Sequence, residues 1–468
     1  MPERLSPLDV SFLYMEEQTT PMHVGTLALF DGDDAFDLEH LTGLIERRIA
    51  RVPRYRQRVR PVPGRLANPV WVDDPHFDVN YHVRQSVLPR PGTDAQLREL
   101  VGRVMSRPLD RNRPLWEMYL VEGMEENRFA ILSKTHQALV DGVTTVEIGQ
   151  VILDAEAADP VGEPEPESWH AGPEPTWLDL VGDAAAGAVR RPSMVADTVR
   201  SAVGDMRSVA ERAWDAASGV FAVATTAVRP APPSPLNGVI GSHRRYATAS
   251  TDLEDYRRIR DSREMRREST VNDVVLAVVA GALREWLLMR GEPVAPQTTV
   301  RALVPVSVRE DEQTGQTKNA ITTYLVDLPV GENNPLMRLH QVTYAMRAHK
   351  ESGQAVGANT LIALSGFSPT TLHSVAARTA SGLSRRLFNL VVTNVPGPQV
   401  PLYAGESRML EAYPVVPLAK GQAVSIGLTS YDGNVYFGLN ADRDLLPDVD
   451  LLADCLVDSL TELVETVK

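Results

Sequence analysis

The chain of 468 residues contains one cysteine, Cys455, which argues against an internal disulfide framework, a zinc ribbon and a CxxC redox pair. Cys455 lies in the apolar segment LLADCLVDSL, where a buried structural thiol is expected. Aromatic residues make up only 6% of the chain, and acidic residues outnumber basic residues by 61 to 47, which gives a net charge of −14. This balance is opposite to that of a nucleic-acid-binding protein, so no nucleic acid is expected as a partner.

Long hydrophobic runs are also absent. The longest one covers residues 274–283, about half of the ~20 residues that a membrane-spanning helix requires. The first residues, MPERLSPLDVSFLYMEE, carry acidic side chains and no uninterrupted apolar stretch, so no signal peptide is expected. We therefore predict a cytoplasmic protein, and contact with a membrane from one side stays an open alternative.

The common motifs of several enzyme classes are missing as well. The sequence contains no GxSxG elbow, no Walker A loop, no GxGxxG after a strand and no HExxH motif. Its ten histidines are scattered, and none forms a cluster with the spacing of metal ligands. The sequence therefore predicts no bound metal, no nucleotide cofactor and no phosphate-binding loop.

Strand-like and helix-like patterns alternate in both halves of the chain, which predicts an α/β fold with mixed sheets. Two globular domains are expected, over residues 1–155 and 246–468. Residues 156–245 begin as a linker rich in proline and glutamate and continue as an Ala-rich, amphipathic helical crossover. The clearest elements are a strand over 22–30, a helix over 35–53, a helix capped by Thr93 or Asp94 that stops before Pro108, a hairpin over 116–137, a helix over 269–291 and a terminal helix over 447–467. Ser269 or Thr270 is expected to cap the helix over 269–291.

The most unusual local string is KTHQALVDG, residues 134–142. It places His136 at the end of an apolar strand, and Asp141 with Gly142 opens the next helix, so that a carboxylate can fold back. An imidazole at a strand end can take a proton from an alcohol that attacks a thioester or ester carbonyl. The alternative is a pair of His136 and Asp141 that is satisfied structurally and has no catalytic role.

This string resembles the HHxxxDG signature of the bacterial wax ester synthase/acyl-CoA:diacylglycerol acyltransferase family, a branch of the HHxxxDG acyltransferase superfamily. The resemblance covers essentially the whole chain, and the actinobacterial triacylglycerol synthases look closest. More distantly, the chain resembles chloramphenicol acetyltransferase and the condensation domains of peptide synthetases. Blocks similar to those of the family follow one another in order: LSPLDVSFLYMEEQTTPMHVG, PVWVDDPHFDVNYHV, RPLDRNRPLWEMYLVEG, STVNDVVLAVVAGALREWL, RALVPVSVRED, NVPGP and SIGLTSYDGNVYFGLNAD.

The resemblance implies two chloramphenicol-acetyltransferase-like domains joined by the helical crossover, with the active site in a tunnel between them. It implies that a long-chain acyl group moves from acyl-CoA, a co-substrate, to diacylglycerol or a fatty alcohol, with no cofactor. A histidine is the general base in this family, and His136 is the candidate here. The motif aspartate, which Asp141 matches, organises the loop through a buried ion pair. Because the lipid substrates lie in membranes and droplets, peripheral contact with the inner membrane face or with lipid droplets is a further expectation.

One position departs from the family pattern. His136 matches the first histidine of the motif, but Gln137 stands where the family has the second histidine, its general base. A glutamine amide can orient a hydroxyl group but cannot take its proton. Neighbouring side chains of an extended chain point to opposite faces, so His136 cannot replace the missing base simply by being adjacent. Three hypotheses stay open: His136 acts as the base in a shifted geometry, positioning alone sustains catalysis, or the protein is a non-catalytic or weakly active lipid- or acyl-binding homologue.

Three other residues match family blocks. Asn272 and Asp273 match an Asn-Asp motif, and they are expected in the first turn of a helix, where acids interact well with the helix dipole. A structural role is expected for both, with the tunnel wall as the alternative. Ser425 is a candidate for bonding an oxyanion or an acceptor hydroxyl group, or for a structural role. Within the crossover, residues 184–228 form either surface helices that pack on the protein or helices that lie on a lipid surface.

Overall fold

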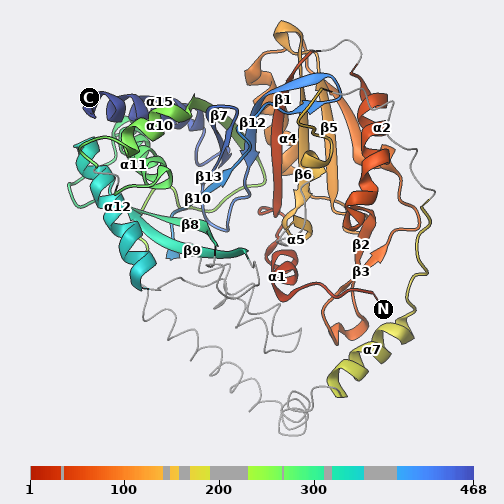
Figure 1. Ribbon diagram of the computed structural model, residues 1–468. Helices are drawn as coiled ribbons and strands as arrows, with labels where there is room; N and C mark the ends of the chain where they lie inside the picture. Colours follow the sequence, from red (N-terminus) through yellow and green to blue (C-terminus); the bar gives the residue numbers. More distant parts are fainter. Residues whose placement is uncertain are drawn as a thin grey trace, which may run out of the picture.

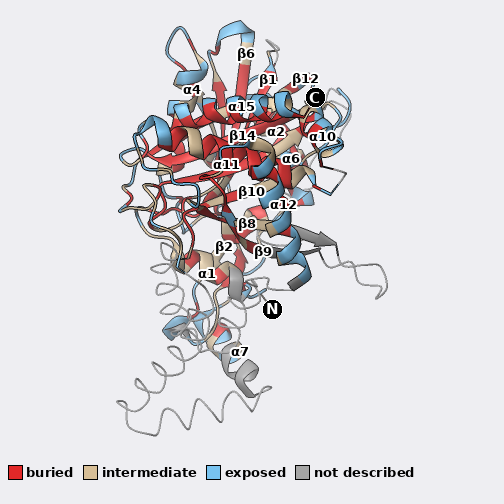
Figure 2. Ribbon diagram, turned by 90° about the vertical axis from the view of Figure 1, so that its left-hand side faces the viewer, coloured by how far each residue is buried: buried red, intermediate tan, exposed pale blue. Residues whose placement is uncertain are grey.

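The computed structural model describes residues 2–32, 36–140, 148–157, 169–189, 230–265, 268–309, 319–352 and 387–467. Within these ranges the chain forms two lobes that stand side by side, each built on a six-stranded sheet (Figure 1). Buried residues concentrate on the strands and on the helix faces that pack against them (Figure 2). The predicted α/β class with mixed sheets is confirmed.

The first lobe contains a sheet with the strand order β11-β12-β1-β6-β5-β4. β4 and β5 are parallel and the other neighbours are antiparallel, and β5 and β6 form the predicted hairpin. β2 and β3 pair separately as a two-stranded sheet. The elements are α1 (Pro7–Met15), β1 (His23–Asp31), α2 (Leu38–Arg48), β2 (Gln57–Arg60), β3 (Val70–Asp73), α3 (Val79–His82), β4 (Val83–Val87), α4 (Asp94–Ser106), β5 (Trp116–Glu122), β6 (Arg128–His136), α5 (Gln137–Val140), α6 (Ile148–Val151), β11 (Tyr403–Ala404) and β12 (Ser407–Val415).

The second lobe has the strand order β7-β14-β13-β10-β8-β9, in which β10 is parallel to both of its neighbours. α11 is the helix predicted over 269–291, and Thr270 caps it through a reciprocal pair of hydrogen bonds with Asp273. The elements are β7 (Arg244–Asp252), α10 (Leu253–Arg260), α11 (Val271–Met289), β8 (Val300–Arg309), β9 (Asn319–Leu328), α12 (Pro335–Ser352), β10 (Leu390–Pro396), β13 (Val424–Tyr431), β14 (Asn434–Asp442) and α15 (Val449–Thr466).

One predicted helix was too long. Residues 35–53 were expected to form a single helix, but α2 covers only Leu38–Arg48, and the Asp37 side chain caps its first turn. Two short 3-10 segments, Ile49–Arg51 and Pro53–Arg56, follow it. Proline has no N–H group to continue an α-helix, but it suits the first position of a new turn, and the second 3-10 segment begins at Pro53.

A strand from the last part of the chain completes the first sheet. β12 pairs with β1 in antiparallel register and with the short β11 on its other side, although β10 before them and β13 after them belong to the second sheet. The end of β12 passes close over the second sheet at Gly427 and Gly438, which are paired across β13 and β14. A Cβ atom on Gly438 would lie 1.9 Å from the carbonyl oxygen of Pro414, so only glycine permits this approach. The two lobes are therefore joined by shared β-structure.

Part of the predicted linker and crossover lies outside the described residues, namely 158–168 and 190–229. Between these gaps the structure describes α7 (Trp177–Val189), whose buried Leu180 packs against Val62, Val70 and Val72. The domain boundaries expected from the sequence stay a prediction. Among the helices in the described part of the chain, none combines the length and the apolar character needed to cross a membrane.

Candidate active site

The string KTHQALVDG of the first lobe, residues 134–142, contains the junction of β6 and α5. His136 is the last residue of β6 and Gln137 is the first residue of α5. The backbone N–H of His136 donates to the carbonyl oxygen of Leu115 at 2.9 Å, and that of Gln137 donates to Met22 at 2.8 Å. The strand end is therefore fixed from both sides. Asp141 and Gly142 lie outside the described residues, so their predicted roles stay predictions.

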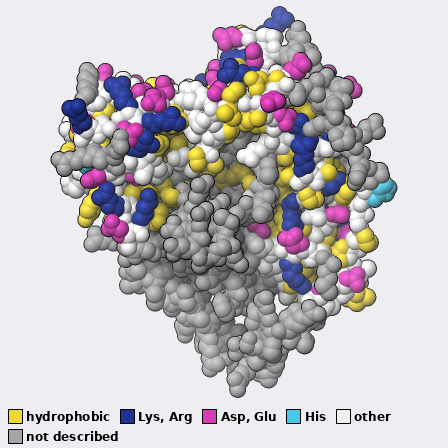
Figure 3. Space-filling view, viewed as in Figure 1, with side chains coloured by type: hydrophobic (Ala, Val, Ile, Leu, Met, Phe, Trp, Pro, Cys, Tyr) yellow, Lys and Arg dark blue, Asp and Glu magenta, His cyan; other side chains and the backbone are white. Residues whose placement is uncertain are grey.

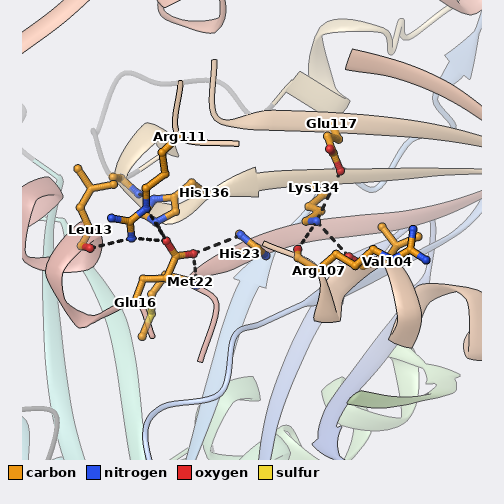
Figure 4. Close-up of polar contacts among 11 residues, drawn as sticks. Leu13, Glu16, Met22, His23, Val104, Arg107, Arg111, Glu117, Lys134 and His136 are labelled. Carbon is orange, nitrogen blue, oxygen red and sulfur yellow. Dashed lines mark hydrogen bonds and ion pairs between the residues drawn. The ribbon is translucent and has the colours of Figure 1, made fainter. Parts of the chain in front are cut away.

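The His136 imidazole is buried, with 1% of its surface exposed. Its Nδ1 accepts a hydrogen bond from the backbone N–H of Ala138 at 3.0 Å. Because a backbone N–H can only donate, this contact places the proton of the neutral ring on Nε2. Nε2 lies 3.6 Å from Oε2 of Glu16 (Figure 4). Both ring nitrogens of His136 therefore face protein groups.

Glu16, directly after α1, is the centre of this cluster. Its carboxylate lies 3.4 Å from Nε2 of His23, accepts from Nε of Arg111 at 3.1 Å and accepts from the backbone N–H of Met22 at 3.3 Å. A second guanidinium nitrogen of Arg111 also donates to it. Burial alone would raise the pKa of Glu16, but the contacts with His136, His23 and Arg111 outweigh it and hold the pKa far below its ordinary value. Glu16 is therefore ionised at neutral pH.

His23 reaches the cluster because β1 pairs with β6. His23 and His136 are directly opposite in the register, and their rings meet edge to face with centroids 6.2 Å apart. Burial lowers the pKa of His23 to about 4, although Glu16 acts in the opposite direction. His23 is therefore neutral at pH 7, and it contributes a dipole rather than a charge.

A buried ion pair lies two residues before the histidine on the same face of β6. Nζ of Lys134 is 3.5 Å from the Glu117 carboxylate, which also accepts from the Tyr119 hydroxyl at 2.8 Å. The same ammonium donates to the carbonyl oxygens of Val104 at 3.0 Å and Arg107 at 2.6 Å. Burial lowers the pKa of Lys134 to about 8. Because these carbonyls lie at the end of α4, Lys134 caps that helix and has a structural role.

Among the described residues of the string, 134–140, Gln137 and Val140 are partly accessible, and Gln137 is the polar one of the two. It is half-buried, whereas His136, Ala138 and Leu139 are buried. The space-filling view shows a recess between the two lobes on the face of Figure 1, with hydrophobic side chains along its edges (Figure 3). An amide at this junction can donate to one oxygen and accept from a hydroxyl group at the same time.

The other candidate residues lie in the second lobe. Oδ1 of Asn272 accepts from Asn394 at 3.3 Å, and buried Asp273 forms the capping box of α11, where burial raises its pKa. The Ser425 hydroxyl donates to the carbonyl oxygen of Val416 at 2.7 Å, immediately after the strand that crosses between the lobes. For Asp273 and Ser425 these contacts favour the structural alternative.

Sequence reasoning missed Glu16, His23 and Arg111. Each is separated from His136 by 25 residues or more in the printed sequence. The pairing of β1 with β6 places His23 opposite His136, and Arg111, which precedes β5, reaches the cluster through Glu16. The one signal for them in the sequence is their place at the ends of secondary-structure elements: Glu16 directly follows the first helix, and His23 is the first residue of the first strand. In the described ranges, no group of three or more His, Cys, Asp or Glu side chains has a geometry that could hold a metal ion.

Comparisons with known proteins identify the family. The model of the wax ester synthase/diacylglycerol acyltransferase catalytic domain matches residues 5–275, and that of the WS/DGAT C-terminal domain matches residues 317–464. A Mycobacterium tuberculosis protein named as a probable diacylglycerol O-acyltransferase, tgs1, is 34% identical over 467 residues, covering 99% of this chain and 96% of that protein. A second protein named in the same way, tgs2, is 32% identical over 472 residues, with 99% of both chains covered.

Solved structures agree with this assignment. The wax ester synthase/diacylglycerol acyltransferase of Marinobacter aquaeolei VT8 superimposes with a TM-score of 0.68 at 28% identity, covering 99% of both chains. The first condensation domain of the calcium-dependent antibiotic synthetase shares the fold, with a TM-score of 0.58 at 15% identity over 100% of this chain and 96% of that one. The chain is therefore a member of the wax ester synthase/diacylglycerol acyltransferase family of acyltransferases.

Proposed function

We propose that this protein transfers a long-chain acyl group from acyl-CoA to the free hydroxyl group of diacylglycerol, so that triacylglycerol and free CoA are formed. A fatty alcohol is the second acceptor class, which would give wax esters. The observation that carries the proposal is the full-length similarity to proteins named as diacylglycerol O-acyltransferases, together with the two family domains. The reaction joins the acceptor oxygen to the thioester carbon, breaks the carbon–sulfur bond and returns CoA as a thiol.

The junction of β6 and α5 is the proposed reaction site. It carries His136, which matches the first histidine of the family motif, and Gln137, which stands at the position of the second, and a network centred on Glu16 surrounds it. Acyl transfer of this kind needs oriented reactants more than a resident cofactor, because the thioester is already activated. The assignment of the general base to His136 and of the loop organiser to Asp141 stays a hypothesis from the sequence.

We also propose peripheral contact with a lipid surface. Trp177 and Leu178 at the start of α7 are 62% and 61% exposed, and the first turn of this helix protrudes from the first lobe (Figure 1). Exposed tryptophan and leucine side chains are typical of helices that lie in the interface of a membrane. A variant with Trp177→Ser and Leu178→Ser should sediment less with phosphatidylcholine vesicles that contain diacylglycerol. Unchanged sedimentation would assign membrane contact, if any, to another surface.

The test of the reaction is a thiol-release assay with palmitoyl-CoA and dioleoylglycerol, with triacylglycerol measured in parallel. Each buried methylene group contributes ~0.8 kcal/mol, so affinity should rise steeply from acetyl-CoA to palmitoyl-CoA. The polyanionic CoA moiety should bind more weakly as salt is raised. Equal rates with acetyl-CoA and palmitoyl-CoA would contradict lipid synthesis. Binding of palmitoyl-CoA without thiol release would indicate a non-catalytic acyl-binding homologue.

A further inference from the structure

We infer that His136 is a positioning residue held by Glu16, and that Gln137 is the side chain that contacts the acceptor hydroxyl group during acyl transfer. The inference rests on the proposed acyl transfer and deepens it. It has a chemical consequence: the proton of the acceptor hydroxyl group leaves with the sulfur atom of CoA and does not pass through an imidazole.

The first step concerns the groups that Nδ1 and Nε2 of His136 contact. A general base must offer a lone pair to the hydroxyl group whose proton it takes. The neutral imidazole has one such lone pair, and on His136 it is on Nδ1, where it accepts the N–H of Ala138 at 3.0 Å. The proton on Nε2 faces the Glu16 carboxylate at 3.6 Å. No lone pair of this ring is left for a substrate, and the ring is buried.

The second step is the rigidity of Glu16. The turn that follows it is held by the second lobe, because Lys420 pairs with Glu17 at 2.6 Å and the buried Arg244 donates to the carbonyl oxygen of Thr19. Arg111 holds the Glu16 carboxylate itself (Figure 4). The carboxylate cannot move aside to free His136 without loss of these contacts. Glu16 therefore holds its charge at ion-pair distance from Nε2 of the ring, and Nδ1 of the ring bonds the backbone N–H of Ala138, next to Gln137.

The third step is the chemistry that Gln137 can perform. Its amide oxygen can accept a hydrogen bond from the acceptor hydroxyl group, which orients the hydroxyl oxygen toward the thioester carbon. The amide is not basic enough to remove the hydroxyl proton. The new carbon–oxygen bond forms as the carbon–sulfur bond breaks, and the bonding electron pair leaves with sulfur. A thiol has an ordinary pKa of about 8.5, so the leaving thiolate of CoA can take the proton released by the alcohol, directly or through one water molecule. The products are the ester and CoA thiol, and the step balances.

The charged and titratable groups around His136 define the pH test. Glu16 follows α1, His23 lies on β1, Arg111 precedes β5, and Lys134 lies on the same strand as His136. If His136 only positions, the pH profile of kcat should keep its shape in the His136→Asn variant, because asparagine can still accept the N–H of Ala138 but has no basicity. The Gln137→His variant should gain an ascending limb near about pH 6.5, the ordinary pKa of histidine.

The experiment compares kcat, KM and pH profiles of the full-length protein and its variants with palmitoyl-CoA and dioleoylglycerol. His136→Asn should lose less than about tenfold in kcat, whereas removal of a general base costs about 10²- to 10⁴-fold. Glu16→Ala should lower kcat by about 10- to 100-fold with a smaller change in KM, because the amide of Gln137 is displaced, and Glu16→Gln should recover part of that loss. The matched control is Glu254→Gln on α10, which removes one carboxylate from an exposed pair with Arg257.

Two results would overturn the inference. One is a loss of 10²-fold or more in a folded His136→Asn variant, together with the disappearance of an ascending limb of the wild-type profile. The other is independent of activity: nitrogen-15 NMR of histidine-labelled protein, with the His136 signals assigned by the His136→Asn variant. A pyridine-like Nδ1 and a pyrrole-like Nε2 are expected, and a protonated Nδ1 would refute the proposed geometry. If the wild type releases no thiol, the proposed function fails, and the NMR result still decides the role of His136.

Discussion

The end of β6 and the middle of α11 are both buried, but the β6 side chains are polar and those of α11 are apolar. Residues 274–283 of α11 are all apolar or glycine, and all are buried. The last four residues of β6, Ser133, Lys134, Thr135 and His136, are all polar and also buried. Apolar burial is favourable in itself, whereas polar burial costs free energy unless partners are supplied. The first lobe therefore concentrates its specific, long-range hydrogen bonds at the strand that carries the family motif.

The partners of the β6 residues come from distant parts of the chain. The Ser133 hydroxyl bonds the backbone of Thr26, Lys134 bonds the end of α4, and His136 faces Glu16. Residues 274–283 of α11 need no such partners, because their side chains pack against apolar neighbours from several elements. The end of β6 depends on a few directional hydrogen bonds, and the middle of α11 depends on many apolar contacts. Single substitutions in the two regions should therefore change the free energy of unfolding in different ways.

The largest effect is expected at Lys134. The Lys134→Met variant would leave the buried Glu117 carboxylate and two helix-end carbonyls without their cation, which should destabilise the protein by about 3–5 kcal/mol. The measurement is the shift of the urea unfolding curve followed by tryptophan fluorescence. Lys350→Met on the exposed face of α12 is the control, with an expected change of less than about 0.5 kcal/mol. The second change Glu117→Gln should restore part of the loss, and failure to do so would separate Lys134 from this pair.

In α11, Leu276→Ala should cost about 2–5 kcal/mol through the cavity that it leaves, because Leu276 is fully buried. The specific activity of the protein that remains folded should not change, because α11 supplies apolar packing at this position. Leu276→Met, which conserves volume, should cost less than about 1.5 kcal/mol. A drop in kcat at unchanged folded fraction would show that this part of α11 also shapes the reaction site.

Acidification should weaken the first lobe through its buried histidines. Burial lowers the pKa of His82 to about 4, and its Nδ1 bonds the carbonyl oxygen of Trp116 at 2.7 Å. Because the unfolded chain binds the proton below pH ~6.5 and the folded chain only near pH 4, stability should fall as pH decreases through this window. At pH 5 the loss attributable to His82 should be about 2 kcal/mol. His82→Gln should flatten the dependence of the unfolding midpoint on pH, and an unchanged slope would rule out His82 as its source.

The smallest effect is expected at Tyr246, which combines both kinds of burial. Its ring lies in the core of the first lobe, although β7 belongs to the second sheet, and its hydroxyl donates to the carbonyl oxygen of Pro414 at 3.0 Å. Tyr246→Phe keeps the apolar contact and removes one hydrogen bond, so a loss of about 1 kcal/mol is expected in urea unfolding. Tyr246→Leu should cost more, because it also removes ring packing.

Local signals in the sequence predicted local structure well. The helix caps and the β5–β6 hairpin depend on interactions within a few residues: the caps lie at Thr93 and Thr270, each one of the two positions that the sequence offers, and the hairpin forms as predicted. The position of His136 at a strand end was also predictable from the apolar pattern that precedes it. These features require no knowledge of distant contacts.

The rest depends on long-range pairing. The insertion of β12 beside β1 is accompanied by the close approach of its end to Gly427 and Gly438, and neither glycine carries a local signal for a strand from another lobe. Glu16 and His23 reach His136 only through this sheet. The orientation of the His136 ring depends on a single backbone N–H of Ala138, which the residue type does not reveal.

The placement of β12 also has a consequence for biosynthesis. β1 is flanked by β6 on one side and β12 on the other, and β12 begins about 375 residues after β1 ends. At a translation rate of roughly 5–20 residues per second, β1 waits roughly 20–75 s on the ribosome for its second neighbour. During that interval the nascent first lobe presents an unpaired strand edge, the kind of surface that templates aggregation. When many ribosomes translate one messenger RNA, several such strand edges lie close together. Faster translation of the codons between β1 and β12 shortens the interval in which the edge is exposed, so the demand for chaperones should fall.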